Sequence, residues 1–271
     1  MDLLSHCIKA VELVKARRAQ IEGKGSRALY GSEDTLMADK RAEDLLTAYF
    51  KEQGVPGVIV SEELSKEGKS ISLGNKYLIT VDPYDGTMNF KRKTCLPYGA
   101  LVAIFSSLKP KYKDALAAAI VSLTDDDLWY AGKGKGCFYK GRESQGLEVR
   151  CSASRQTAIS RESFLFVDFF HQQSGLLRAK FPDAYVRNIG SAAIELALIA
   201  GGNADARFST CQKAHELGAG NLLIEEAGGI GLTLEGKKLR SLPYDFDAVV
   251  PCIHAGTEEM ADEILRGLWN S

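Results

Sequence analysis

The sequence predicts a layered α/β protein in which sheets and helices stack face to face. Two regions are dense in short, continuous apolar runs, which are typical of buried strands. Segments with helical periodicity lie before, between and after these regions, so the order is not a clean βαβ alternation. The chain has 271 residues, 45% of them hydrophobic, and can bury a large core. We expect a single domain over 1–271, with subdomains over 1–150 and 151–271 as the alternative.

The first part of the chain predicts two helices. Residues 2–22 carry apolar side chains at helical spacing, and the charged residues between them exclude the apolar core of a secretory signal peptide. A loop containing glycine and serine is expected over 23–31. A second helix is expected to begin near 34–39 and to run through Phe50. No run approaches the ~20 apolar residues that cross a membrane.

The remaining elements follow from apolar runs and from their boundaries. Strands are predicted over 58–60, 77–81, 99–105, 115–123, 164–167 and 248–253. A hairpin is predicted to join 128–130 to 137–139, and we interpret the glycines between them as a turn, because no helical pattern follows for a phosphate loop. Helices are predicted over 174–180, 191–199, 213–227 and 257–268. The third of these ends at Gly228 and Gly229, as a helix C-cap should.

Composition excludes several classes of function. The net charge is −1, so no global field attracts nucleic acid or an acidic membrane. The six cysteines are scattered without a CxxC pair, and the four histidines show no zinc-ligand spacing. We therefore expect reduced thiols and a cytoplasmic protein.

The most informative segment is VDPYDGTMNF, residues 81–90, which follows a predicted buried strand. Pro83 fixes its own φ and biases Asp82 toward an extended conformation, so the predicted turn is stiff. Asp82 and Asp85 can then face one small volume while the backbone N–H groups after Gly86 point into it. Carboxylate oxygens suit Mg²⁺ and amides suit a phosphate. The same residue types also suit an ordinary turn, so the rest of the chain must decide.

Acidic residues stand at the ends of other predicted elements. Asp39 opens a helix, Glu62 and Glu63 end a strand, and Glu216 lies near the start of a late helix. Each alone is explained as a helix-terminal or surface charge. Because neighbouring strands often end at the same edge of a sheet, we expect these acids to converge with those of the 81–90 segment.

The segment resembles the DPxDGTxNF signature of the inositol monophosphatase superfamily, which includes fructose-1,6-bisphosphatases and bisphosphate nucleotidases. The intervals from Asp39 to Glu62 and from Glu62 to Asp82 are similar to those of the inositol monophosphatase branch. Further stretches resemble the family's hairpin, its G[ST]AA helix opening, its GxADA segment and its [IL]xEEAGG run: 129–136, 190–193, 202–206 and 223–229. The resemblance implies a five-layer αβαβα fold, commonly a homodimer, and a Mg²⁺-dependent, often lithium-sensitive phosphatase of a small phosphorylated metabolite.

The resemblance also implies roles for single residues, with two or three Mg²⁺ in the site. One ion would be held by Glu62, Asp82 and the backbone carbonyl of Tyr84. A second would be held by Asp82, Asp85 and Glu216.

The remaining implied roles concern water and phosphate. Asp39 and Thr87 would orient and deprotonate the attacking water, and the N–H groups of Gly86 and Thr87 would hold the phosphate. Glu63 would be a supporting acid or a ligand of a third metal. The substrate side would include Gly190 and Ser191.

The sequence departs from the family pattern around the last metal ligand. Where the family has WDxAxG, this chain has His215 and Glu216, so the carboxylate is kept on a longer arm. A glutamate at this place is similar to the classical fructose-1,6-bisphosphatases. We interpret His215 as a packing substitution for the tryptophan. Ser209 aligns with the glutamate that inositol monophosphatases use for ring hydroxyls, which weakens the inositol assignment. Lys213 resembles a basic residue near a second phosphate, with a plain solvated lysine as the alternative.

The sequence thus predicts a Mg²⁺-dependent phosphomonoesterase acting on a small phosphorylated sugar or polyol. Fructose-1,6-bisphosphatase activity, inositol-1-monophosphatase activity, or both are expected. The alternatives are a 3′(2′),5′-bisphosphate nucleotidase and a binding or regulatory homologue with impaired catalysis.

Overall fold

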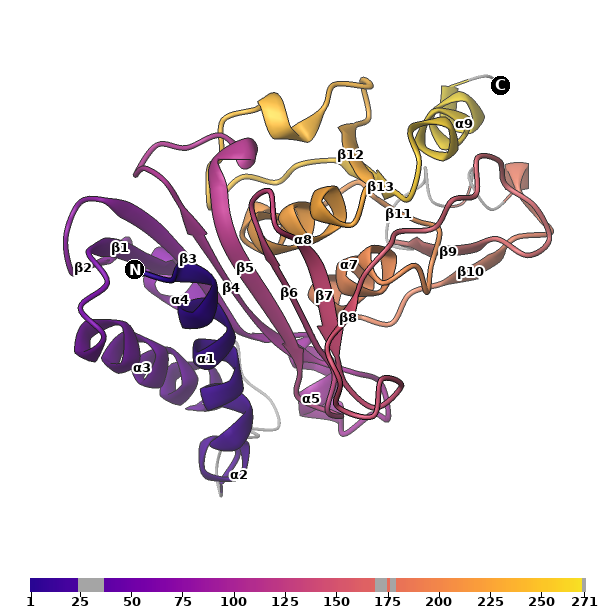
Figure 1. Ribbon diagram of the computed structural model, residues 1–271. Helices are drawn as coiled ribbons and strands as arrows, with labels where there is room; N and C mark the ends of the chain where they lie inside the picture. Colours follow the sequence, from indigo (N-terminus) through magenta and orange to yellow (C-terminus); the bar gives the residue numbers. More distant parts are fainter. Residues whose placement is uncertain (24–36, 169–174, 176–178, 270–271) are drawn as a thin grey trace.

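The structure, a computed structural model, describes residues 1–23, 37–168, 175 and 179–269. Helices α7 and α8 lie between two sheets, other helices cover the outer face of each sheet, and the result is five layers (Figure 1). The first layer contains α1 (Leu3–Ala16), α2 (Arg18–Ile21) and α3 (Met37–Glu52). The middle layer is α7 (Ala192–Ala200) and α8 (Ala214–Glu226), and α9 (Glu258–Trp269) forms the last. The predicted αβαβα arrangement is confirmed.

The larger sheet has eight strands in the order β2-β1-β3-β4-β5-β6-β7-β8. Its strands are β1 (Gly57–Ser61), β2 (Ile71–Ser72), β3 (Tyr77–Asp85), β4 (Gly99–Phe105), β5 (Ala115–Ser122), β6 (Leu128–Gly132), β7 (Gly136–Lys140) and β8 (Val149–Arg150). β1 and β3 pair in parallel, and the remaining pairs are antiparallel. The short helices α4 (Glu62–Lys66) and α5 (Thr87–Arg92) follow β1 and β3 directly. Both parallel strands therefore deliver their next residues to the same edge of the sheet.

The smaller sheet has five strands in the order β10-β9-β11-β13-β12. Its strands are β9 (Phe164–Val167), β10 (Tyr185–Arg187), β11 (Ala206–Ser209), β12 (Ile230–Thr233) and β13 (Cys252–Ala255). β9 pairs in parallel with β10 and β11, and β13 is antiparallel to both of its neighbours. Two short 3₁₀ turns complete the described elements: η1 (Tyr112–Asp114) and η2 (Leu239–Ser241).

Three apolar cores hold the layers together. The first lies between the larger sheet and α1 and α3, and the second joins the other face of that sheet to α7 and α8. The third lies between the smaller sheet and α9. On α8, a Cβ added at Gly220 would lie 2.8 Å from the Cβ of Leu196 on α7, and one at Gly218 would lie 3.3 Å from the Phe105 ring. These glycines let α8 approach both its neighbouring helix and the sheet.

Several sequence expectations need correction. The expected helix over 2–22 is two helices, because the backbone leaves helical geometry at Arg17. The strand expected over 248–253 begins and ends later, as β13. The elements α4, α5, β2, β8, β10, β11 and β12 were not predicted. The expected loop over 23–31 and the expected helix over 174–180 fall mostly outside the described residues.

Two further findings concern the whole described chain. No helix among the described ranges has both the length and the apolar character needed to cross a membrane. All six cysteines are free thiols, and four of them are buried.

Candidate active site

A bulge in β3 brings two acidic residues of the 81–90 segment to one side of the larger sheet. Asp82 pairs with Leu101 and Asp85 with Gly99, so β3 advances one residue more than β4 between these pairs. In a regular strand, residues three apart face opposite sides. Here the extra residue lets oxygens of Asp82 and Asp85 lie within 4.8 Å of each other and of Glu216. The segment is therefore a bulge inside a strand, and the predicted turn at its start is wrong.

The bulge leads into a close contact with the middle layer. Gly86 has φ +85° and separates β3 from α5. A Cβ at this position would lie 3.0 Å from the Cβ of Ser191 and 3.2 Å from the carbonyl oxygen of Gly190. Only glycine combines the left-handed backbone with this contact.

Two helix starts supply the other acids. Ser61 caps α4 by accepting a hydrogen bond from the N–H of Leu64, which places Glu62 in the first turn. α8 begins after Lys213, with His215 and Glu216 in its first turn. Both helix starts face the edge at which β3 ends.

Each carboxylate is held through one of its oxygens. Glu62 Oε1 accepts from Lys213 Nζ at 2.7 Å, and Asp82 Oδ1 accepts from the N–H of Tyr84 at 3.1 Å. Asp85 Oδ2 accepts from the Ser191 hydroxyl and, at 2.9 Å, from the N–H of Ala193.

The fourth carboxylate is held by a buried polar chain. Gln212 donates to Glu216 Oε2 and accepts from Arg207. Arg207 is 8% exposed and pairs with Glu195, its Nε lying 2.6 Å from Glu195 Oε2. Glu195 also accepts from the N–H of Ile189 at 2.9 Å. This chain fixes the start of α8 relative to α7 and β11.

The close packing of the acids raises their pKa values. Burial and then the charges of Asp85 and Glu62 hold the pKa of Asp82 well above its ordinary value. Burial and the charges of Asp85 and Asp82 do the same for Glu216. Burial also raises the pKa of Asp85, although hydrogen bonds from Ser191 and Ala193 oppose the shift.

Asp39 and Glu62 differ in their surroundings. Burial, with the charges of Glu63 and Glu62, raises the pKa of Asp39 to about 7. Burial alone would raise the pKa of Glu62, but the hydrogen bond and charge of Lys213 lower it below its ordinary value. Of Asp39, Glu62, Asp82, Asp85 and Glu216, only Glu62 has a cationic side chain within hydrogen-bond distance among the described residues.

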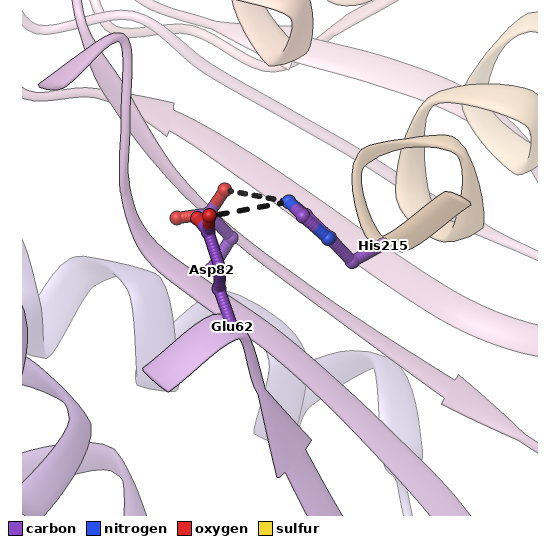
Figure 2. Close-up of side chains that lie close together, drawn as sticks. All are labelled: Glu62, Asp82 and His215. Atoms are coloured by element: carbon purple, nitrogen blue, oxygen red, sulfur yellow. Dashed lines mark ion pairs between the residues drawn. The ribbon is translucent and has the colours of Figure 1, made fainter. Parts of the chain in front are cut away.

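His215 also faces this cluster. Its ring stacks on Phe246, with 5.2 Å between centroids, and its Nε2 lies 3.7 Å from Asp82 Oδ2 and 3.9 Å from Glu62 Oε2 (Figure 2). Burial lowers the pKa of His215 to about 4, although the charge of Glu62 opposes this. The packing role expected for His215 is present, but the ring also points a nitrogen at the acids.

The structure gathers nearly all the sequence-predicted residues around one pocket. The pocket is lined by Glu62, Asp82, Tyr84, Asp85, Gly86, Thr87, Gly190, Ser191, Ser209, Lys213 and Glu216. Asp39 is buried and does not line it. Thr87 Oγ1 donates to the Tyr84 carbonyl at 2.8 Å, and no hydrogen bond among the described residues joins Thr87 to Asp39.

Sequence reasoning missed Arg207, Gln212 and Glu195, which also line the pocket. An arginine inside the apolar strand β11 was the available signal for a buried charge pair. It also missed Asp168, which lines the pocket and accepts a hydrogen bond from the Cys211 thiol at 2.6 Å. Nothing in the local pattern of Gln212 indicated its contact with Glu216.

Residues 1–271 match the model of the inositol monophosphatase family. The chain belongs to this family. Its members are phosphoric monoester hydrolases, so the predicted enzyme class is confirmed. The family is generally metal-dependent, and two groups of residues could hold ions here: Glu62, Asp82 and His215, and Asp82, Asp85 and Glu216. The carboxylate oxygens in both groups suit a hard cation such as Mg²⁺.

Similar proteins include enzymes with two different names. A fructose-1,6-bisphosphatase/inositol-1-monophosphatase from Methanothermobacter thermautotrophicus is 27% identical, covering 94% of this chain and 95% of the relative. A fructose-1,6-bisphosphatase from Pyrococcus furiosus is 28% identical, covering 90% and 87%. The solved structure of a Thermotoga maritima IMPase matches with a TM-score of 0.78 at 19% identity, covering 99% and 97%, and supports the fold.

Replacement of Arg207 should destabilise the protein strongly. In Arg207→Met, Glu195 is left buried without its partner, and Gln212 loses one of its contacts. We expect a loss of about 3–5 kcal/mol in unfolding free energy, measured by urea denaturation. The matched control Arg161→Met breaks an exposed pair with Asp183, whose side chains are 85% and 63% exposed, and should cost less than about 1 kcal/mol. Equal losses in the two variants would contradict the structural role of Arg207.

The contribution of Asp39 to the stability of the metal-free protein should be lost as the pH rises from about 4 to about 7. The raised pKa of Asp39 means that the folded state keeps a proton that the unfolded chain has released. This stabilisation is complete below the ordinary carboxyl pKa and is lost as the pH rises through about 7. The buried histidines, His215 and His254, have lowered pKa values and act in the opposite direction, because below about 6.5 the unfolded chain binds protons at these residues that the folded state does not.

Added Mg²⁺ should therefore raise the melting temperature more near pH 8 than near pH 6.5, as measured by scanning calorimetry after EDTA treatment. Asp82→Asn removes one of the repelling charges and should flatten the pH dependence. A Mg²⁺ effect of equal size at both pH values would show that the acids do not drive it.

Proposed function

We propose that the protein is a Mg²⁺-dependent phosphomonoesterase that hydrolyses a small phosphorylated sugar or polyol. The observation that carries the proposal is the convergence of Glu62, Asp82, Asp85 and Glu216 at one end of a pocket. Such a cluster cannot stay ionised without cations. The raised pKa values of three of these acids are the electrostatic cost that bound cations would remove.

We assign Glu62, Asp82 and the Tyr84 carbonyl to one Mg²⁺, and Asp82, Asp85 and Glu216 to a second. Bound Mg²⁺ would neutralise the phosphate, make the attacking water more acidic and stabilise the leaving oxygen. Asp82 is shared between the two positions, and the bulge in β3 is what allows it to face both. A third ion beside Glu63 is part of the same proposal.

The proton of the attacking water is assigned to Asp39 and Thr87. The pKa of Asp39 is raised to about 7 in the metal-free site, and bound cations would lower it. The assignment therefore follows the family pattern, in which the threonine pairs with this aspartate. Thr87 stands at the start of α5 with its hydroxyl on the Tyr84 carbonyl. Its hydroxyl would orient the water, and Asp39 would accept the proton through it.

The phosphate is assigned to the backbone between β3 and α5. The first N–H groups of a helix have no partner inside the helix, and Gly86 turns the chain so that the groups of Gly86 and Thr87 follow the acids directly. Gly190 and Ser191 lie against Gly86 and limit the space on the other side. The substrate would therefore be held with its phosphate near Gly86.

The substrate proposed first is a sugar bisphosphate, with inositol phosphate close behind. Ser209 is buried and offers no carboxylate for ring hydroxyls. Lys213 lines the pocket with its side chain 51% exposed, so it can meet a second phosphate. Relatives of similar identity carry the names fructose-1,6-bisphosphatase and inositol monophosphatase, so the choice rests on Ser209 and Lys213.

A bisphosphate nucleotidase and a homologue with impaired catalysis remain the alternatives. The second has little support, because Glu62, Asp82, Asp85 and Glu216 all line the pocket and the charge of Asp39 acts on Asp82. A cytoplasmic homodimer is likewise proposed from the family resemblance.

Asp82→Asn should abolish Mg²⁺-dependent phosphate release. The variant loses a charge shared by both proposed ions, and the loss of several kcal/mol of charge stabilisation corresponds to a fall in kcat of at least about 10²-fold. Phosphate release from fructose 1,6-bisphosphate and from inositol 1-phosphate would be measured with Mg²⁺ and with EDTA. Asp126→Asn, at an exposed acid paired with Lys15, is the control and should keep full activity. Turnover by Asp82→Asn at the control rate, or turnover insensitive to EDTA, would refute the mechanism.

Lys213→Ala should narrow the preference for fructose 1,6-bisphosphate over inositol 1-phosphate. The ammonium also holds Glu62, so the variant should weaken turnover of both substrates. That common effect cancels in the ratio of the two kcat/KM values. The ratio therefore reports only the contribution of the second phosphate of fructose 1,6-bisphosphate. An unchanged ratio of the two kcat/KM values would contradict a contact between Lys213 and a second phosphate, and would leave the hydrogen bond to Glu62 as the contact of this lysine in the pocket.

A further inference from the structure

The ring nitrogen Nε2 of His215 is a buried polar atom whose role in the site is not explained by packing. The residue is 5% exposed, and Nε2 has no hydrogen-bond partner among the described residues. Buried polar atoms are nearly always satisfied, so an orphaned one calls for a partner. A tryptophan or phenylalanine would fill the same space against Phe246 without placing a lone pair there.

The distances around Nε2 are those expected of donor atoms grouped around one common centre. Nε2 lies 3.7 Å from Asp82 Oδ2, 3.9 Å from Glu62 Oε2 and 4.0 Å from Glu216 Oε1. These separations are too long for hydrogen bonds. Two ligands each about 2.1 Å from one ion lie about 3.4 Å apart at the tetrahedral angle and about 4.2 Å apart when opposite. The observed separations fall between these limits.

The carboxylates near His215 are arranged to leave an oxygen for such an atom. Glu62 is held by Lys213 through Oε1, and Asp82 by the Tyr84 N–H through Oδ1. In each case the other oxygen is the one nearest to His215. Figure 2 shows the imidazole reaching from α8 toward these two carboxylates. The three donors come from α8, β3 and α4 and form one compact group.

We propose that His215 Nε2 is a direct ligand, with Glu62 and Asp82, of one cation in the site. This inference rests on the proposed metal-dependent function and goes beyond it, because a nitrogen ligand changes which ion is preferred. Imidazole raises affinity for later divalent transition metals, whereas Mg²⁺ prefers oxygen ligands and water. This position should therefore bind Zn²⁺ or Co²⁺ more tightly than Mg²⁺.

The test measures metal binding directly, on the tag-free full chain after EDTA treatment. Protein loaded with Mn²⁺ and labelled with ¹⁵N at histidine is examined by pulsed electron paramagnetic resonance, which detects nitrogen bound to the metal. Calorimetric titration gives the dissociation constants of Co²⁺ and Mg²⁺. We expect nitrogen coupling in the natural protein and its loss in His215→Phe, which keeps an aromatic ring against Phe246.

The affinities should change selectively. Even residues that only support a metal ligand typically change metal affinity by about 10–100-fold, so loss of a direct ligand should weaken Co²⁺ binding at least about tenfold. Mg²⁺ binding should change less than about threefold, because the oxygen ligands remain. His6→Phe, on α1 and paired with Tyr49, is the matched control and should leave both values and the coupling unchanged. His215→Gln, examined in the same way, covers the case in which His215→Phe does not fold.

Three results would overturn the proposal: no nitrogen coupling in the natural protein, coupling that persists in both His215 variants, or an unchanged Co²⁺ affinity. The outcome for the proposed function is read separately, from Mg²⁺-dependent phosphate release by the natural protein. Phosphate release without nitrogen coupling refutes only the ligand role of His215, and coupling without phosphate release refutes only the phosphatase assignment.

Discussion

Mutual repulsion among four carboxylates is the constraint on which the rest of the site depends. The bulge in β3 turns Asp82 and Asp85 the same way, and the first turns of α4 and α8 add Glu62 and Glu216. Left alone, such charges would push the elements apart or take up protons. Hydrogen bonds hold one oxygen of each carboxylate in place. The other oxygen of each remains available to the metal ions on which the family generally depends.

Much of this arrangement was predictable from the sequence, because chemistry-bearing residues occur in a specific pattern. Buried strands such as β4 and β5 are continuous apolar runs, and residues 82–87 carry a specific signature. The bulge was not predictable, since Asp-Pro-Tyr-Asp-Gly also suits a turn and only the register with β4 decides between them. The strands β10, β11 and β12 have three or four residues each and no alternation that marks them.

The parts of the site that sequence reasoning missed are those that depend on tertiary placement. Lys213 was expected to face substrate, and whether it first meets Glu62 depends on where α8 starts relative to α4. Arg207 and Gln212 act through contacts between β11 and α8 that no local pattern encodes. His215 was interpreted as a packing substitution, and its ring does stack on Phe246. The same ring also directs Nε2 toward Glu62 and Asp82. The direction of a side chain follows from layers that assemble only in the folded protein.

The glycines of α8 limit how this enzyme can diversify. Gly220 lies against Leu196, and Gly218 lies against Phe105, so the middle helices have no spare room beneath the acids. A bulkier residue at either position would move Glu216 away from Asp82 and loosen the packing between α8 and the larger sheet. New substrate preferences must therefore arise from lining residues outside α7 and the body of α8, such as the half-exposed Lys213.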